Sequence, residues 1–155
     1  MTLEELQTDL KCLIHQTVTF KRIACNSIII YFFGEPGDDT VISVFIDPTW
    51  RYHKNAKIIV GSYDLQIEAS EFKTHDEDEY EERFDYLCSL TDGLIGAALI
   101  NCTVEPESWD IIMEFSDNQV LRSFANSAFD DKNWTYRNIP KQITAYISSL
   151  GVRLK

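Results

Sequence analysis

The feature that most constrains this 155-residue chain is an internal repeat with a period of roughly 80 residues. Apolar positions of the first half recur in the second half at a nearly constant offset, more in pattern than in identity. The matched positions are Leu13-Ile14 with Leu94-Ile95, Val18 with Leu99, Ile23 with Val104, Ile29-Ile30 with Ile111-Ile112, Phe33 with Phe115, Val41-Ile42 with Val120-Leu121, and Phe45 with Phe124. We therefore expect a tandem duplication, with a first α+β repeat over 1–73 and a second over 74–155, together forming one globular domain.

Each repeat is predicted to begin with an amphipathic helix. In the first repeat, the apolar positions at helical spacing are Leu3, Leu6, Leu10 and Leu13. Thr2 precedes them as an N-cap, and Glu5 completes the pattern of a capping box. In the second repeat a helix is expected over about 78–90, and its apolar stripe consists of Tyr80, Phe84, Leu87 and Cys88. Asp92-Gly93 then ends this helix.

Three or four strands are predicted to follow each helix. In the first repeat they lie at about 17–23, 27–33, 40–46 and 58–60, and the continuous apolar run of the second indicates burial on both faces. In the second repeat they lie at about 98–104, 111–115, 120–125 and 134–137, with Asp117-Asn118 as a hairpin turn. The first of these strands is expected to face the core with its alternating apolar positions Ala98, Ile100, Cys102 and Val104. Because three-stranded units are marginal by themselves, the repeats should pack together, as one extended sheet or as two sheets face to face.

Two further segments complete the predicted fold, which belongs to the α+β class. Pro140 is well placed for the first turn of a C-terminal helix that runs to about Leu150, and Gly151 follows as its stop. The basic and aromatic segment Trp50–Lys54 is expected to be a loop that packs Trp50 and Tyr52 on the sheet.

The net charge of the chain indicates which kinds of molecule it can bind. There are 25 acidic and 14 basic residues, which gives a formal net charge of -11. Such a surface repels nucleic-acid phosphates and attracts basic proteins, although it also serves simple solubility. The N-terminal residues do not form a basic region before an apolar run, and no stretch of 18 apolar residues occurs. We therefore expect a cytoplasmic protein that binds another protein and neither nucleic acid nor membrane.

The sequence contains none of the motifs that carry chemistry. A nucleophile elbow, a phosphate-binding glycine loop and a zinc-protease motif are all missing. Cys12 and His15 lie one helical turn apart, but a metal site needs further ligands, so we expect neither metal nor cofactor. The cysteines are interpreted as reduced core residues, and they are Cys12, Cys25, Cys88 and Cys102. We predict that the protein is not an enzyme.

The strongest local signal is the acidic run 76–85, in which seven of ten residues are Asp or Glu. A few carboxylates at a helix N-terminus are explained by the helix dipole, but seven exceed that need, and Asp78 and Glu82 repel each other at i, i+4 spacing. The run is either a solvated helix start or a docking surface for a basic partner. The residues predicted to bind the partner are Asp76, Glu77, Asp78, Glu79, Tyr80, Glu81, Glu82 and Asp85.

Segment 94–137 resembles a known kind of domain. Leu94-Ile95-Gly96 opens a strand, Trp109–Asn118 leads into Val120–Phe124, and Trp134 closes the unit. This segment is similar to the β-meander of small bacterial domains of unknown function, whose relatives include immunity proteins of polymorphic and contact-dependent toxin systems. It departs from that pattern at Asp117-Asn118, where such hairpins often have Asp-Gly.

The resemblance implies a function without supplying any catalytic residue. Immunity proteins of this kind are small, cytosolic and often acidic, and they neutralise a cognate toxin, often a basic nuclease, by direct docking. The leading hypothesis is therefore a monomeric, stoichiometric inhibitor of a basic toxin. Two alternatives stay open at this point. One is a phage- or plasmid-type inhibitor that mimics nucleic acid, and the other is a module that binds a small ligand in a cleft between the two repeats.

Overall fold

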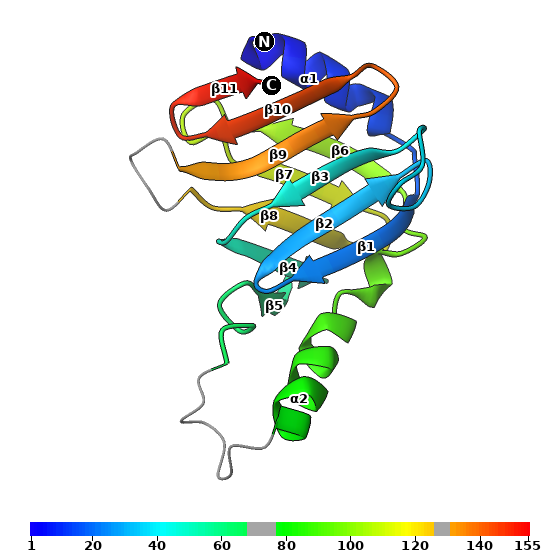
Figure 1. Ribbon diagram of the computed structural model, residues 1–155, viewed down its shortest axis with the longest axis vertical. Helices are drawn as coiled ribbons and strands as arrows, with labels where there is room; N and C mark the ends of the chain where they lie inside the picture. The colour runs from blue at the N-terminus through cyan, green and yellow to red at the C-terminus, as the bar shows by residue number, and fades with distance from the viewer. Residues whose placement is uncertain (68–76, 126–130) are drawn as a thin grey trace.

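Two antiparallel β-sheets lie face to face in the computed structural model, which describes residues 1–67, 77–125 and 131–155 (Figure 1). The six-stranded sheet has the order β1-β2-β3-β9-β10-β11, and the five-stranded sheet has the order β5-β4-β8-β7-β6. The strands of the first are β1 (Val18–Ala24), β2 (Ser27–Phe32), β3 (Ile42–Ile46), β9 (Lys132–Asn138), β10 (Ile143–Ser148) and β11 (Gly151–Leu154). Those of the second are β4 (Trp50–Lys54), β5 (Lys57–Gly61), β6 (Leu99–Val104), β7 (Ile111–Phe115) and β8 (Gln119–Ser123).

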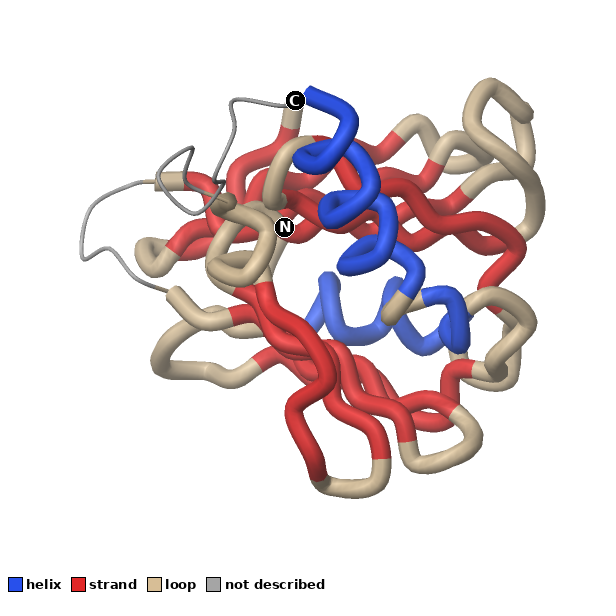
Figure 2. Tube along the Cα trace, turned by 90° about the horizontal axis from the view of Figure 1, so that it is seen from below, coloured by secondary structure: helices blue, strands red, loops and turns tan. Residues whose placement is uncertain are grey.

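Two α-helices accompany the sheets, α1 (Leu3–Leu10) and α2 (Glu77–Ser89). Each is followed by a short 3-10 helix, η1 (Lys11–Leu13) after α1 and η3 (Asp92–Leu94) after α2. The α+β class is therefore confirmed, and two sheets face to face is the arrangement found. Figure 2, seen from below, shows the sheets as two layers.

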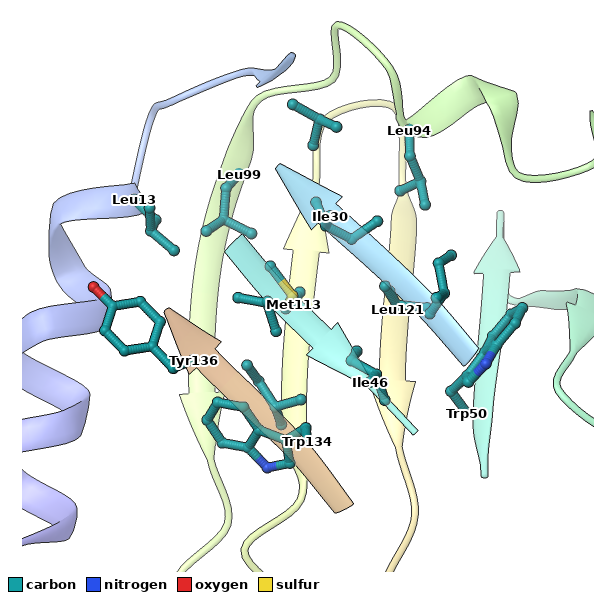
Figure 3. Close-up of a cluster of buried hydrophobic side chains, with 14 of the residues drawn as sticks. Leu13, Ile30, Ile46, Trp50, Leu94, Leu99, Met113, Leu121, Trp134 and Tyr136 are labelled. Carbon is teal, nitrogen blue, oxygen red and sulfur yellow. The ribbon is translucent and has the colours of Figure 1, made fainter. Parts of the chain in front are cut away.

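The core lies between the two sheets and follows from the two-residue period of the strands (Figure 3). In β2 and β3 the inward positions are apolar and fully or almost fully buried, and they are Ile28, Ile30, Phe32, Ile42, Val44 and Ile46. From the opposite sheet they meet Leu99, Ile111, Met113 and Leu121, which are also buried. Two tryptophans, Trp50 of β4 and Trp134 of β9, fill the lower part of this layer in Figure 3.

Helix α1 forms as the sequence predicts. The backbone N–H of Glu5 donates to the Thr2 hydroxyl at 3.1 Å, and the Thr2 N–H donates to the Glu5 carboxylate at 2.6 Å, so the capping box is present. Leu6 and Leu10 are fully buried against the sandwich. Burial of a leucine stabilises the fold by about 1.5–3 kcal/mol, so this helix belongs to the core.

The two halves of the chain use their elements in the same order. The first half places β1-β2-β3 in the six-stranded sheet and β4-β5 in the other, whereas the second half places β6-β7-β8 in the five-stranded sheet and β9-β10-β11 in the other. A register shift interrupts β1 between Val18 and Phe20, and another interrupts β6 between Leu99 and Asn101. The halves are joined where β3 pairs with β9 and where β4 pairs with β8.

Matching side-chain bonds accompany this common order. The Trp50 indole N–H donates to the Asn26 carbonyl in the β1–β2 turn at 2.8 Å. The Trp134 indole N–H donates to the Trp109 carbonyl in the β6–β7 connection at 2.7 Å. His15 and Gly96, each two residues after a 3-10 helix, both adopt positive φ, with values of 68° and 80°.

The predicted C-terminal helix over 140–150 is wrong. The segment forms the hairpin β10–β11, in which Ala145 and Ile147 point inward at alternating positions and are fully buried. Ile147 pairs with Trp134 of β9, so burial at a period of two outweighs the proline and glycine signals. Pro140 lies in the turn between β9 and β10, where Gln142 has a φ of 56°.

Three smaller expectations also need correction. Trp50–Lys54 is strand β4 and not a loop, although Trp50 and Tyr52 do pack into the core as predicted. Ile100 is 50% exposed, because the register shift in β6 turns it away from the core. The cysteines are free, but Cys12 and Cys25 are exposed and so are not core residues. Cys88 and Cys102 are partly buried, and burial raises the pKa of the Cys102 thiol to about 12.

Candidate functional site

The predicted acidic docking surface lies on α2, apart from Asp76, which falls outside the described residues. Glu77 is the first residue of the helix, and its acidic side chains are all exposed. They belong to Glu77, Asp78, Glu79, Glu81, Glu82 and Asp85. Tyr80 is 40% exposed and stacks on Phe84 with ring centroids 6.2 Å apart, while Tyr86 is 63% exposed. The helix therefore presents carboxylates together with two accessible phenol rings.

The C-terminal half of helix α2 packs on the body, where Phe84, Leu87 and Cys88 are partly buried against the core. None of its residues is fully buried, and Figure 1 shows its N-terminal part projecting away from both sheets. The Lys21 ammonium of β1 donates to the Cys88 carbonyl at 2.9 Å and pairs with Asp92 at 2.8 Å. The Thr91 hydroxyl donates to the same Cys88 carbonyl at 2.8 Å. A cation at the C-terminus and carboxylates in the first turn both favour the helix dipole.

A second candidate site is a hollow of about 690 Å³ on the outer face of the six-stranded sheet. Figure 1 looks onto this face, and no helix lies over it. Its floor comes from β2, β3, β9 and β10, so it sits across the β3–β9 junction of the two halves. The side chains that form the floor include Ile29, Tyr31, Phe45, Thr135, Arg137 and Tyr146. The loop at Pro36–Asp39 forms part of the rim.

The face that carries this hollow is basic, in contrast to the chain as a whole. None of the six strands contains an acidic residue, and the pairing register places Arg22, Arg137 and Arg153 on the outer side. Lys132 also lines the hollow, where its ammonium lies 4.8 Å from the centre of the Phe45 ring and 3.2 Å from the Asp47 carboxylate. Burial raises the pKa of Asp47, and Lys132 opposes that rise.

Tyr31 lies within this basic face. Burial raises the pKa of its phenol, while the charges of Arg22 and Arg137 act in the opposite direction. Within the described part of the chain, neither of these arginines forms a hydrogen bond or an ion pair. Since a guanidinium offers five N–H donors to a carboxylate or a phosphate, each of these arginines is suited to bind an oxyanion.

The outer face of the five-stranded sheet is different. Its Arg122 is held by Glu105, whose two carboxylate oxygens lie 3.0 Å from the same guanidinium nitrogen. Arg51 and Arg122 also lie over the Phe124 ring, with centroid distances of 4.7 Å and 5.0 Å. Arg122 is thus engaged by a carboxylate and both arginines by an aromatic ring, so this face offers less to a ligand.

A polar cluster joins α1 to the six-stranded sheet. The Lys141 ammonium pairs with the Asp9 carboxylate, and the Asn138 amide donates to Asp9 at 3.4 Å and to the Tyr136 hydroxyl at 2.9 Å. Burial raises the pKa of Asp9, but the hydrogen bonds from Lys141 and Tyr136 outweigh it and hold the pKa below its usual value. Burial raises the pKa of Tyr136 far above its usual value. An ionised carboxylate and a neutral phenol suit a structural tether of α1 better than acid–base catalysis at neutral pH.

The structure does not bring the predicted acidic residues and the hollow together. In Figure 1 helix α2 lies below the two sheets, whereas the strands that line the hollow belong to the sheet nearest the viewer. Sequence reasoning missed the hollow. A usable signal was the lack of Asp and Glu in every strand that forms this sheet. Among the described residues there is no cluster of three or more possible metal ligands. The described helices include none that is long and apolar enough to cross a membrane.

Comparison with known proteins gives no match to a protein-family model, a curated protein or a solved structure. The function must therefore be argued from the two surfaces.

Proposed function

We propose that this protein is a cytoplasmic immunity protein that binds and neutralises a cognate bacterial toxin of the basic nuclease type suggested by its charge, with α2 as the docking element. The observation that carries the proposal is the exposure of α2. None of the 13 residues of α2 is fully buried, although Phe84, Leu87 and Cys88 pack against the core, and the rest of the helix exposes six carboxylates and two accessible tyrosines. Tyrosines are enriched at the centres of protein interfaces, and carboxylates speed the capture of a basic partner.

The mechanism needs no catalytic group in this chain. The negative field of a chain with a net charge of -11 steers the basic toxin toward α2. Tyr80 and Tyr86 then provide the apolar contact that slows dissociation. The toxin is inhibited because its basic active site is covered or distorted. Raising the salt concentration should lower the association rate much more than it raises the dissociation rate.

The test is growth rescue. The C-terminal fragment of the reading frame immediately upstream is expressed in a test strain with and without this chain, and rescue from a lethal fragment is the expected result. The triple variant Glu79→Lys, Glu81→Lys, Glu82→Lys should lose rescue, whereas the control Glu4→Lys, Glu35→Lys, Glu107→Lys, with the same change in net charge, should keep it. A lethal fragment that this chain does not relieve would count against the immunity proposal, and rescue by the α2 variant would remove α2 from it.

A second candidate function, a module that binds a small ligand between the two halves, is favoured by the hollow at the β3–β9 junction. Its volume of about 690 Å³ is in the range of small-molecule sites, and its lining mixes apolar side chains with a few polar ones. The nucleic-acid mimic has less support, because the carboxylates of the acidic run lie on one short helix and the outer face of the six-stranded sheet carries arginines.

The two halves themselves are best explained by a tandem duplication, with repeats over 1–73 and 74–155. The common order of elements, the paired register shifts in β1 and β6 and the two indole bonds to equivalent turns all support it. In this scheme the halves exchange their later strands, so that each sheet contains a meander from one repeat and strands from the other. The swap makes the halves one folding unit, because neither can complete a sheet by itself.

A further inference from the structure

The outer face of the six-stranded sheet has the features of an anion site. Tyr31 pairs with Ser43 across β2 and β3, and Ser43 pairs with Arg137 of β9, so these three side chains share one row of the outer face. Arg22 of β1 pairs with Ile29, which lies two residues before Tyr31 in β2 and so on the same outer face. Both arginines are exposed and have no partner among the described residues. The charges of both guanidinium groups act on the Tyr31 phenol, so this part of the outer face has a positive field.

We propose that this hollow binds a small organic anion, whose phosphate or carboxylate group is held by Arg137 within the hollow and attracted by Arg22 on the neighbouring strand β1, and whose apolar body lies over Ile29 and Phe45. The inference rests on the second proposed function, the ligand-binding module, and is independent of toxin binding through α2. Arginine is the residue best matched to phosphate and carboxylate, because its donors form two parallel hydrogen bonds to such groups. The hydroxyls of Tyr31 and Tyr146 add donors near the same floor.

The acidic groups near the hollow offset this field only in part. Asp38 at the rim accepts the Glu35 backbone N–H at 2.8 Å, so one of its oxygens is engaged in the loop. Asp47 is paired with Lys132 at 3.2 Å. Asp39 is the remaining carboxylate of the rim, and its single negative charge is outnumbered by the positive charges of Arg137, Arg22 and Lys155.

The size and charge of the molecule favour a small anion over a nucleic-acid strand. The hollow is of the volume that encloses one drug-sized molecule. A polyanion would extend beyond it and meet the field of a chain with a net charge of -11, which opposes its approach. A compact anion with one or a few charged groups fits inside the basic patch and is repelled much less.

The test is titration of the ¹⁵N-labelled full chain with ATP, inorganic phosphate, adenosine and a single-stranded dT oligonucleotide, followed by backbone amide and arginine Nε–Hε signals. ATP should shift signals of β2, β3 and β9 and those of Arg22 and Arg137, with millimolar affinity or better. Phosphate should compete with ATP, and adenosine should bind at least about tenfold more weakly than ATP, which corresponds to the loss of the charged contacts.

Matched variants locate the site. The double variant Arg22→Gln, Arg137→Gln should weaken ATP binding about tenfold or more. The control Lys54→Gln, Lys57→Gln removes the same charge from β4 and β5 of the other sheet and should change it less than twofold. Unchanged amide spectra of both free variants show that they are folded, and single substitutions replace the double variant if it is not.

Each other outcome overturns the proposal in a recognisable way. If no probe shifts any signal, both the ligand-binding function and this inference fail. If ATP shifts signals elsewhere, or binds equally well to the Arg22→Gln, Arg137→Gln variant, or no better than adenosine, a ligand module survives but the anion site does not. If the oligonucleotide binds this face more tightly than ATP, the occupant is a nucleic-acid strand and the small-anion proposal is wrong.

Discussion

Helices α1 and α2 occupy equivalent places in the two halves, yet they contribute to the fold in opposite ways. Each precedes a 3-10 helix and the first strand of a three-stranded meander. The eight residues of α1 include Leu6 and Leu10, both fully buried, whereas none of the 13 residues of α2 is buried. The architecture therefore uses one of the two helix positions for its core and leaves the other exposed.

The difference shows which constraints shape each helix. The sequence of α1 is explained by folding, because its leucines, its capping box and the Asp9 cluster all attach it to the sandwich. Folding explains only one side of α2, where Phe84, Leu87 and Cys88 pack against the core, and it does not explain the exposed carboxylates and tyrosines. A surface that the core does not need can be selected for binding, which is why α2 is the proposed docking element.

The two helices should differ most in how much stability the protein loses when an apolar side chain is removed from each. Leu10→Ala in α1 should lower the free energy of unfolding by about 2–5 kcal/mol, because it leaves a cavity in a fully buried site. Leu87→Ala in α2 removes a side chain that is only partly buried and should cost less than about 1.5 kcal/mol. Urea denaturation of both variants measures the two values. Equal losses would mean that α2 is as much a part of the core as α1.

The Asp9 cluster should make the attachment of α1 depend on pH. The folded pKa of Asp9 is lowered, so its contribution to stability is complete above the unfolded pKa of about 4 and disappears as the pH falls through the lower folded value. Asp9→Asn should cost about 1–3 kcal/mol at pH 7 and should lose part of the wild-type change in stability between about pH 5 and 2. Urea midpoints measured across this range compare the two proteins. A variant with the same acid dependence as the wild type would rule out Asp9 as the titrating tether.

Patterns that depend on local spacing were predictable from the sequence. The capping box of α1, the helix that became α2, the Asp117-Asn118 turn and most strands follow from short-range periods and turn residues. The acidic residues of α2 were also found, because seven carboxylates in ten residues need no fold to be noticed. These features depend only on residues that are close neighbours in the sequence.

What failed depended on partners far along the chain. The hairpin β10–β11 was taken for a helix because Pro140 and Gly151 are local signals, whereas the pairing of Ile147 with Trp134 is not. The hollow was missed for the same reason, since it requires β3 of one half to pair with β9 of the other. The recurrence of Trp-x-Tyr at Trp50–Tyr52 and Trp134–Tyr136 would have identified β4 and β9 as equivalent strands, each with both aromatic side chains buried.

A smaller effect is expected at the cap of α1. Thr2→Ala removes the hydroxyl that accepts the Glu5 N–H and should lower stability by about 1 kcal/mol. The control is Thr8→Ala, at an exposed position inside the same helix. Because alanine has a higher helix propensity than threonine, this variant should be more stable than the wild type by a few tenths of a kcal/mol. Both values come from urea denaturation. A cap variant no less stable than the control would show that the sandwich holds α1 in place without its capping box.

The smallest effect on stability is expected from the largest change of charge. Glu79→Lys, Glu81→Lys, Glu82→Lys in α2 should alter the free energy of unfolding by no more than about 0.5 kcal/mol, because all three side chains are exposed. Lysines near the N-terminus oppose the helix dipole, while the loss of repulsion among the carboxylates has the opposite sign. Thermal and urea unfolding test this directly. If the variant loses more than about 1 kcal/mol, the carboxylates hold α2 to the fold and its exposure is no longer a reason to assign it to a partner. If stability is unchanged and rescue is lost, the same three residues are needed for binding and not for folding, which is the distinction that separates α2 from α1.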